Sequence, residues 1–413
     1  MWIGIDDTDS PVGMCTTYIG AILVRRLQSE GIQVVDARLV RLNPNVIHKT
    51  RGNAAICVEA KGDIDTAFAL TCACVEELAE FGAAETNPGV AVSGVQPPPD
   101  FYYAALRDFC NLGEAVEVLK SVGARYRGYK NQRGLIGATA AIASDFPDRT
   151  YELLAYRKRE MWGFHRQVDR ESLFFAERMT YPHTWDTVDW ENDVVVSVPH
   201  TPDPVLFGIR GESPTWVTDA RSYVRSEESA CEQVYTTNQG TDAHLVPGTV
   251  GMLREGRSYL VRGTVAATPV TGPGGHVSFP LTDEGVEVRC MAYEPTKGFR
   301  DVVRALIPGD LVVAAGSYKG ESLNLEKLGI SRLADAVRVR PPICPTCRKR
   351  MTSAGTAKGY KCRACGARSR DPEIERLKRP IRPGWYEVPP SARRHLARPL
   401  VRGVPAWQQA LYG

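Results

Sequence analysis

The sequence predicts a multidomain chain of mixed α/β and α+β class that ends in a small barrel and a metal-binding ribbon. Its 413 residues exceed the ~250–300 residues at which single cores stop growing, so several domains are expected. Strand-like and helix-like segments alternate in the first third, and five strand-like runs follow residue 255. Two Cys-x-x-Cys pairs lie near the C-terminus.

The first domain, residues 1–148, is expected to be α/β. Apolar periodicity and intervening glycines are the basis for its elements. Strands are predicted at 1–5, 32–41, 54–60 and 90–94, and helices at 16–30, 65–82, 101–109, 113–121 and 134–144.

The second domain, residues 149–248, is expected to be a small α+β layer, for which we predict a ferredoxin-like arrangement. Its predicted elements are strands at 150–157, 193–198 and 232–237, a helix at 217–226 and a long connection at 161–190. Residues 202–211 are typical of a rigid, partly apolar loop that lines a small pocket. Residues 237–244 are dense in hydrogen-bonding side chains, and an ordinary Asx-rich turn is the alternative.

The third domain, residues 249–338, is predicted to be an OB-fold. Five strands are expected at 257–267, 276–281, 286–293, 310–318 and 321–330, with one helix at 299–307 between the third and the fourth. This is the order of an OB-fold, whose strand face and loops bind oligonucleotides. Another small barrel or sandwich without a nucleic-acid role is the alternative.

Four cysteines predict a zinc ribbon in residues 339–370. Cys344 and Cys347 form one pair, and Cys362 and Cys365 form the second pair after fourteen residues. Four thiolates that close a tetrahedron around zinc make a structural site. A redox dithiol is the alternative, but it needs only one pair. The other seven cysteines are scattered, which is typical of buried reduced thiols.

The charge distribution predicts a polyanion-binding C-terminal region. Residues 341–413 carry 16 Lys/Arg against 4 Asp/Glu, a net charge of +12, whereas residues 1–340 carry 35 against 44, a net charge of −9. Residues 371–413 are expected to be a basic tail, and Trp385 and Trp407 within it favour a binding role over a merely solvated tail.

No stretch approaches the ~20 apolar residues of a membrane span, and a basic-then-apolar signal region is not apparent. A cytoplasmic protein without a membrane partner is therefore expected. The sequence does not predict the oligomeric state, and a monomer is the default.

An acidic cluster ends the first predicted strand. Asp6, Asp7 and Asp9 lie within four residues, and their mutual repulsion is relieved by a divalent cation such as magnesium. The following helix begins near Thr16 and Thr17, and a helix N-terminus is a ready phosphate site. Together these features favour phosphoryl chemistry on a nucleotide. An acidic turn in which Asp9 or Ser10 caps the helix is the alternative.

Two further loops of the first domain suit phosphate binding, because basic side chains and glycines precede regular elements in both. The first is 48–53, with Lys49, Arg51 and Asn53; the second is 130–137, with Lys130, Arg133, Gly134 and Gly137. Neither matches the Walker pattern. Ordinary surface turns are the alternative for each.

These motifs together resemble the archaeal TiaS family, the agmatinylcytidine synthetases of the isoleucine tRNA with anticodon CAU. The resemblance covers essentially the whole chain. The segments that carry it are 6–10, 13–17, 41–45, 49–53, 207–211 and 237–244. It implies the order kinase-like domain, ferredoxin-like domain, OB-fold and zinc ribbon.

The resemblance implies an ATP-driven replacement of the 2-oxo group of the wobble cytidine by agmatine, through a phosphorylated cytidine, with ATP cleaved to AMP and phosphates. Thr16 aligns with a threonine that becomes phosphorylated, and Asp6, Asp7 and Asp9 are implied to hold magnesium. The residues implied at the ATP site are Thr8, Gly13, Thr17, Lys49, Arg51, Asn53, Lys130, Arg133, Gly134 and Gly137. Agmatine is a dication and requires a carboxylate and an apolar wall, for which the candidates are Asp203, Phe207, Gly208, Arg210 and Asp242.

Two other functions remain open on the sequence. A non-enzymatic single-strand nucleic-acid-binding protein explains residues 255–413 but leaves the acidic cluster without a role. Another ATP-dependent RNA-modifying enzyme, with a different amine or a sulfur donor, is the third possibility.

Overall fold

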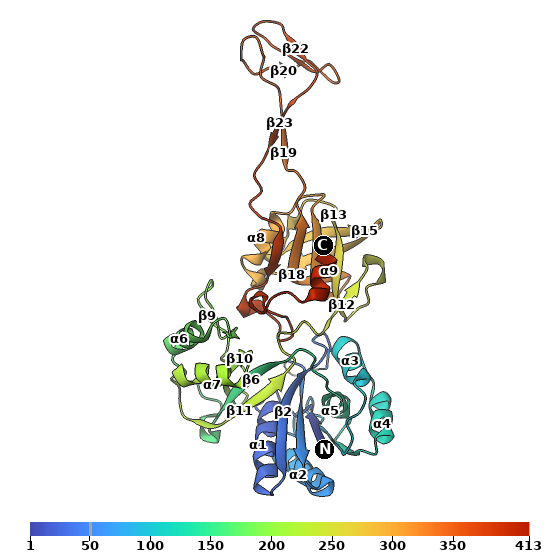
Figure 1. Cartoon of the computed structure of the whole chain (residues 1–413), viewed down its shortest axis with the longest axis vertical. Helices are drawn as coiled ribbons and strands as arrows, with labels where there is room; N and C mark the ends of the chain where they lie inside the picture. Colours follow the sequence, from blue (N-terminus) through green and yellow to red (C-terminus); the bar gives the residue numbers. More distant parts are fainter. Residues whose placement is uncertain (49–51, 413) are drawn as a thin grey trace.

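The computed structural model describes residues 1–48 and 52–412. The molecule is elongated, with the N-terminal α/β part and the green second part at one end of the long axis (Figure 1). The barrel lies in the middle, and the four-cysteine ribbon stands alone at the opposite end on a two-stranded stalk. Among the described residues, no helix combines the length and the apolar character needed to cross a membrane.

One nine-stranded sheet runs through both of the first two parts, in the order β5-β4-β1-β3-β2-β11-β6-β10-β7. The two halves are joined by β2 and β11, which pair in parallel. The strands are β1 Trp2–Asp6, β2 Gln33–Arg41, β3 Ala54–Lys61, β4 Gly89–Ser93, β5 Arg125–Gly128, β6 Thr150–Arg157, β7 Thr184–Trp185, β10 Val205–Gly211 and β11 Ser229–Thr237. The short strands β8 Val188–Asp189 and β9 Val194–Val195 pair with each other.

The two halves of this sheet repeat one topology. The first half runs β1-α1-β2-β3-α2-β4 and its strands lie in the order β4-β1-β3-β2. The second half runs β6-α6-β7-β10-α7-β11, with β8 and β9 inserted, and its strands lie in the order β11-β6-β10-β7. In both halves the fourth strand of the unit lies beside the first, and the third lies between the first and the second.

Helices cover both faces of the first half. Alternate residues of β3 point to opposite faces, so Ile56 and Val58 pack with α1 and α2, whereas Ala55 and Cys57 pack with α3–α5. The helices of the sheet region are α1 Thr16–Ser29, α2 Ile64–Leu78, α3 Asp100–Arg107, α4 Leu112–Ser121, α5 Gly134–Ile142, α6 Arg170–Thr180 and α7 Pro214–Tyr223. The predicted helices and strands of residues 1–148 are confirmed, with β5 as an addition.

Several elements of the second part differ from prediction, among them the short strands β7 and β8 within the expected connection 161–190. The expected connection 161–190 contains α6, which Asp169 caps through the amide of Glu171 and which buries Leu173, Ala176 and Thr180 at helical spacing. The expected loop 202–211 contains β10, an interior strand between β6 and β7. Its glycines and its arginine obscured an extended segment that only its neighbours in the sheet stabilise.

The barrel closes through five strands in the order β13-β15-β16-β18-β17, since β13 pairs with both β15 and β17. Its elements are β13 Ser258–Val265, β15 Val277–Asp283, β16 Val286–Ala292, α8 Phe299–Arg304, β17 Leu311–Lys319 and β18 Ser322–Arg332, with β12 Leu245–Gly248 and β14 Val270–Thr271 at its margins. The five predicted strands and the helix between the third and the fourth are confirmed.

The segment 371–413 is not the free tail that its composition suggests. It begins in the stalk, where β23 Glu373–Arg376 pairs with β19 Val337–Arg340, and it continues onto the barrel, where β24 Gly384–Glu387 pairs with β18. The last helix, α9 Ala406–Tyr412, lies against β13, β17 and β18. Several of its arginines meet carboxylates of the other parts, including Arg393 with Asp186 and Arg402 with Glu212. Its basic residues therefore connect parts of the protein, which composition alone does not show.

Candidate active site

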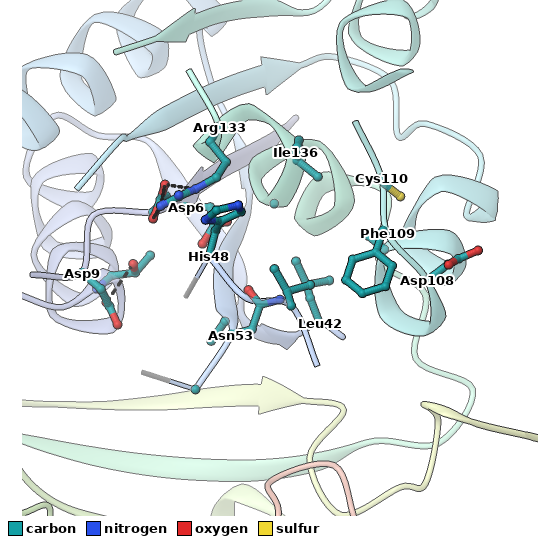
Figure 2. A pocket seen from close by; sticks show the side chains of 17 residues that line it. Asp6, Asp9, Leu42, His48, Asn53, Asp108, Phe109, Cys110, Arg133 and Ile136 are labelled. Atoms are coloured by element: carbon teal, nitrogen blue, oxygen red, sulfur yellow. Dashed lines mark hydrogen bonds and ion pairs between the residues drawn. The ribbon is translucent and has the colours of Figure 1, made fainter. Parts of the chain in front are cut away.

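A cavity of about 190 Å³ lies in the first part, where β1 ends and α1 and α5 begin. Figure 2 shows Asp6, Asp9 and Arg133 on one side and the ring of Phe109 with Asp108 on the other. The lining residues are Asp6, Asp7, Asp9, Thr16, Leu42, Val46, His48, Gly52, Asn53, Ala54, Ala105, Asp108, Phe109, Cys110, Arg133, Ile136 and Gly137. The acidic cluster and Thr16 therefore meet in one cavity.

Thr16 is a polarised hydroxyl at the start of α1. Its backbone amide and its Oγ1 both donate to Asp9 Oδ1, at 2.7 and 3.1 Å. Thr8 Oγ1 donates to the Thr16 oxygen at 3.0 Å. Asp9 is thus positioned to take the proton of this hydroxyl, and the N-terminus of α1 is positioned to stabilise negative charge added to it.

Asp6 and Asp7 lie in different surroundings. Arg133 donates from Nε and Nη2 to the two oxygens of Asp7, at 2.9 and 3.0 Å. Burial raises the pKa of Asp7 to about 7, against the opposing effect of Arg133. Burial, with the nearby charge of Asp7, raises the pKa of Asp6 well above its usual range. A Cβ on Gly137 would lie 1.8 Å from Asp6 Oδ2, so only glycine lets α5 approach this carboxylate.

Of the other residues expected at the ATP site, some line the cavity and others do not. Asn53 lines the cavity and donates to the backbone oxygen of Asn43 at 3.0 Å. Lys130 instead donates to the backbone oxygens of Phe81 and Ala83. Gly134 packs against β4, and Gly13 and Thr17 flank Thr16 without lining the cavity. Lys49 and Arg51 lie outside the described residues.

The five residues expected around agmatine do not share one pocket. Phe207 is fully buried in the core of the second part, and Gly208 packs against Leu154 and Glu152. Arg210 pairs with Glu152 at 3.1 Å. Asp242 is buried and pairs with Lys327 of the barrel at 2.6 Å. These four residues are therefore packed against, or paired with, other residues of the protein itself.

Asp203 lies at a second cavity of about 690 Å³, beside apolar residues that include Leu173, Val195 and Val198. Its carboxylate accepts from the amide of Val205 at 2.9 Å and lies 3.6 Å from Arg166. The loop before it approaches the Thr16 turn, because a Cβ on Gly13 would lie 3.4 Å from the backbone oxygen of Pro202.

Several cavity residues were not expected from the sequence. Leu42, Val46, Phe109 and Ile136 form an apolar wall opposite the carboxylates, as a planar aromatic base requires. The segment Arg41–Asn45 was noted as a motif, but nothing in the sequence connected it with Phe109, which follows α3.

Four thiols gather in the distal ribbon. The sulfur atoms of Cys344, Cys347, Cys362 and Cys365 all lie within 4.8 Å of one another, as four ligands of one metal ion require. The sulfur of Cys344 is 3.4 Å from that of Cys365, and the sulfur of Cys347 is 3.3 Å from that of Cys362. The predicted four-thiolate site is thereby confirmed for the described residues.

Three family models match the chain. The model of the TiaS TCKD domain matches residues 2–72, that of the TiaS FLD domain residues 132–244, and that of the TiaS C-terminal zinc ribbon domain residues 341–381. Together with the acid-lined cavity and the barrel, these matches define the class of protein, a multidomain tRNA-modifying enzyme with a zinc ribbon. The chain belongs to the TiaS family.

Individual relatives agree over nearly the full length. The isoleucine-tRNA 2-agmatinylcytidine synthetase TiaS of Methanocorpusculum labreanum is 51% identical over 404 residues, which cover 97% of each chain. A solved complex of TiaS with its isoleucine tRNA and ATP has a TM-score of 0.90 at 40% identity and covers 98% of each chain. A complex of TiaS with the same tRNA, AMPCPP and agmatine has a TM-score of 0.87 at 38% identity and the same coverage.

Proposed function

We propose that this protein joins agmatine to the wobble cytidine of the isoleucine tRNA with anticodon CAU at the expense of ATP, forming agmatidine. The observation that carries the proposal is the full-length likeness to structures solved with an isoleucine tRNA, a nucleotide and agmatine. The cavity around Asp9 and Thr16 supplies the chemistry that such a reaction needs. A carbonyl oxygen is a poor leaving group, but after phosphorylation it leaves as phosphate when an amine attacks.

For the metal we propose magnesium, held by Asp6, Asp7 and Asp9. Two adjacent half-buried carboxylates and a third from the same turn are hard oxygen ligands, which magnesium prefers. A bound dication offsets the charge on a triphosphate and stabilises the developing charge during phosphoryl transfer. Arg133 holds Asp7 from the other side and limits its movement.

For Thr16 we propose the role of phosphoryl acceptor. Its oxygen would form the new bond to a phosphorus of ATP as the bond from that phosphorus to its bridging oxygen breaks, and the rest of the nucleotide would leave with the bridging oxygen. The threonine proton would pass to Asp9, which already accepts that hydrogen bond. The hydroxyl of Thr8 would continue to donate its hydrogen bond to the Thr16 oxygen during the phosphoryl transfer. Amides at the start of α1 then face the added charge.

For agmatine we propose the cavity beside Asp203. The guanidinium requires a carboxylate, and its methylene chain requires an apolar wall such as that of Leu173 and Val198. The approach of Pro202 to the Gly13 turn supports this choice, because it brings the cavity loop toward Thr16. Phe207 and Asp242 are less suited, since neither of them lines this cavity.

For the domain division we propose a kinase-like ATP-binding unit in 1–148, a ferredoxin-like unit in 149–248, an OB-fold in 249–338 and the zinc ribbon in 339–370. The strand order β11-β6-β10-β7 with α6 and α7 between supports the second assignment. The closed five-stranded order with α8 between its third and fourth strands supports the third.

One experiment tests the whole proposal. Purified protein, ATP, agmatine and an isoleucine tRNA transcript with a CAU anticodon are incubated, and the tRNA is analysed by nucleoside mass spectrometry. We expect a mass gain at the wobble cytidine and AMP release that both require agmatine and tRNA. Tight tRNA binding without AMP release or a mass change would instead establish a non-enzymatic binding protein.

A further inference from the structure

Arg41 is a buried arginine that lacks the partners such a residue normally has. Its side chain is 12% exposed, and its Nε atom is buried without a hydrogen-bond partner in the part of the chain that the structure describes. Its Nη1 donates to the backbone oxygen of Gly52 at a long 3.4 Å, and its Nη2 lies 3.9 Å from Glu152. A buried guanidinium carries five donors, so this one is poorly satisfied and costs stability as it stands.

A second cation stands beside it. Arg210 takes the other oxygen of Glu152 at 3.1 Å and donates to His395 Nδ1 at 2.7 Å. Burial lowers the pKa of Arg41 to about 10, and Arg210 adds to the fall. Asp186 also lies 3.9 Å from Arg210, but this carboxylate is already paired with Arg393. Two guanidinium groups therefore share mainly one carboxylate.

The position of Arg41 follows from the parallel pairing of β2 and β11, which brings both C-terminal ends to one edge of the sheet. Asn238, the residue after β11, accepts from the Arg41 amide at 2.8 Å and donates to its carbonyl oxygen at 2.9 Å. Gln239 donates to Glu152. The polar segment that starts at Thr237 thus holds the backbone of Arg41 and the carboxylate of Glu152, which lies 3.9 Å from the guanidinium.

The guanidinium lies beside the wall of the acidic cavity. Gly52, whose oxygen Arg41 contacts, lines that cavity. A Cβ on Gly52 would lie 2.8 Å from Arg41 Nη1 and 3.1 Å from the His395 ring. A side chain here would separate Arg41 and His395 from the cavity rim, and glycine leaves the approach open.

We propose that Arg41, with Arg210 beside it, is a phosphate-binding residue, and that Asn238 and Gln239 are its positioning residues. The inference rests on the proposed function, since it takes the substrates to be a nucleotide and an RNA. The phosphate belongs either to the nucleotide or to the RNA backbone, and both present pairs of oxygens that the planar guanidinium binds bidentately. A bound phosphate would accept hydrogen bonds from the unused donors of Arg41 and offset its charge. The poorly satisfied arginine would thereby gain the partners that it lacks.

Arg38 offers a matched control on the same strand. It is fully partnered, by Asp36 and Glu59 at 2.9 Å each and by the oxygen of Ser144 at 3.0 Å. The variants Arg41→Met and Arg38→Met are compared in the full-length protein. Their dissociation constants are measured for a non-hydrolysable ATP analogue without RNA and for the tRNA without nucleotide, and Tm is measured without either.

We expect Arg41→Met to keep or raise Tm and to weaken one of the two ligands roughly 10- to 100-fold, as the loss of a charged hydrogen-bonding partner does. If only the affinity for the ATP analogue falls, the phosphate belongs to the nucleotide. If only the affinity for tRNA falls, it belongs to the RNA. Arg38→Met should lower Tm and change neither affinity. Arg41→Lys should recover part of the lost affinity.

The inference is overturned if both affinities stay unchanged in Arg41→Met, whether Tm falls or not. Because the readouts are binding and melting, they remain informative even if the wild-type protein makes no agmatidine. Failure of the proposed function would appear separately, as the absence of the tRNA mass change.

Discussion

Asp9 accepts two hydrogen bonds from Thr16, one from its backbone amide and one from its hydroxyl. One carboxylate oxygen thereby caps the first turn of α1 and polarises the hydroxyl that we propose as phosphoryl acceptor. The same oxygen therefore provides the cap that the acidic-turn alternative expected and the hydrogen bond to Thr16 that the catalytic interpretation, still a prediction, requires. The structure unites them because Asp9 and Thr16 stand on either side of one tight turn.

Replacing Thr16 by Val should lower agmatidine formation by about 100-fold or more, because the isosteric side chain lacks the accepting oxygen. Phosphopeptide mapping after incubation with ATP should place phosphate on Thr16 in the wild-type protein. Thr17, whose hydroxyl contacts Cys15 Sγ and not Asp9, is the internal comparison. Phosphate on neither threonine would remove the acceptor role.

Replacing Asp6, Asp7 or Asp9 by Ala should abolish AMP release, since each change removes a proposed metal ligand. The affinity for tRNA should change little, because the ribbon stands at the opposite end of the molecule from this part of the chain (Figure 1). Turnover and tRNA binding are measured on the same preparations. Near-normal turnover in all three variants is incompatible with the metal assignment.

Replacing Asp203 by Asn should raise the KM for agmatine roughly tenfold or more, because a charged partner of the guanidinium is lost. The KM for ATP should stay close to that of the wild type. Asp219→Asn, on α7 and outside this cavity, is the matched control. An unchanged KM for agmatine in Asp203→Asn would show that agmatine binds elsewhere.

Replacing Cys362 and Cys365 by Ser should release zinc and unfold the ribbon locally, because two of four thiolates are lost. The affinity for tRNA should then fall and lose part of its salt dependence, since exposed Lys and Arg residues such as Arg348 and Lys361 surround the site. Binding of the ATP analogue should persist. Cys231→Ser, at a half-buried thiol of the second part, controls for the substitution itself.

In that experiment tRNA titrations across a salt series provide the measurement. An unchanged affinity and slope in the zinc-free double variant would show that the ribbon does not contact the RNA.

The pH dependence of stability should carry a contribution from Glu177 of α6. Burial raises the pKa of this carboxyl from 4.5 to about 7, while the amides of Val188 and Thr187 oppose the change. The folded state therefore holds the proton more tightly than the unfolded state, and this stabilisation, present below pH 4.5, is lost as the pH rises toward 7. A tenfold difference in proton affinity between the folded and unfolded states corresponds to roughly 1.4 kcal/mol of stability.

Denaturant unfolding of the wild type and of Glu177→Gln between pH 4 and 8 measures this contribution. The variant should lose less stability over that range, whereas Glu171→Gln, at an exposed position of the same helix, should follow the wild type. Parallel curves for the wild type and Glu177→Gln would mean that Glu177 does not titrate as its burial suggests.

The sequence alone determined the features whose evidence is local. The spacing of Cys344, Cys347, Cys362 and Cys365 predicts the four-thiolate site because each pair belongs to one tight turn. The acidic turn with Thr16 was identified for the same reason, and the barrel followed from the order of its strands and its helix.

The tertiary structure decided what depends on residues distant in the chain. The parallel pairing of β2 with β11 joins segments far apart in the sequence. No local sequence pattern therefore predicts the continuous sheet or the contact between Arg41 and Asn238. The same holds for Asp242, whose carboxylate looked suited to agmatine but is occupied by Lys327 of the barrel. A sequence shows which charges exist, and only the fold decides which of them are neutralised by a partner and which stay available for a ligand.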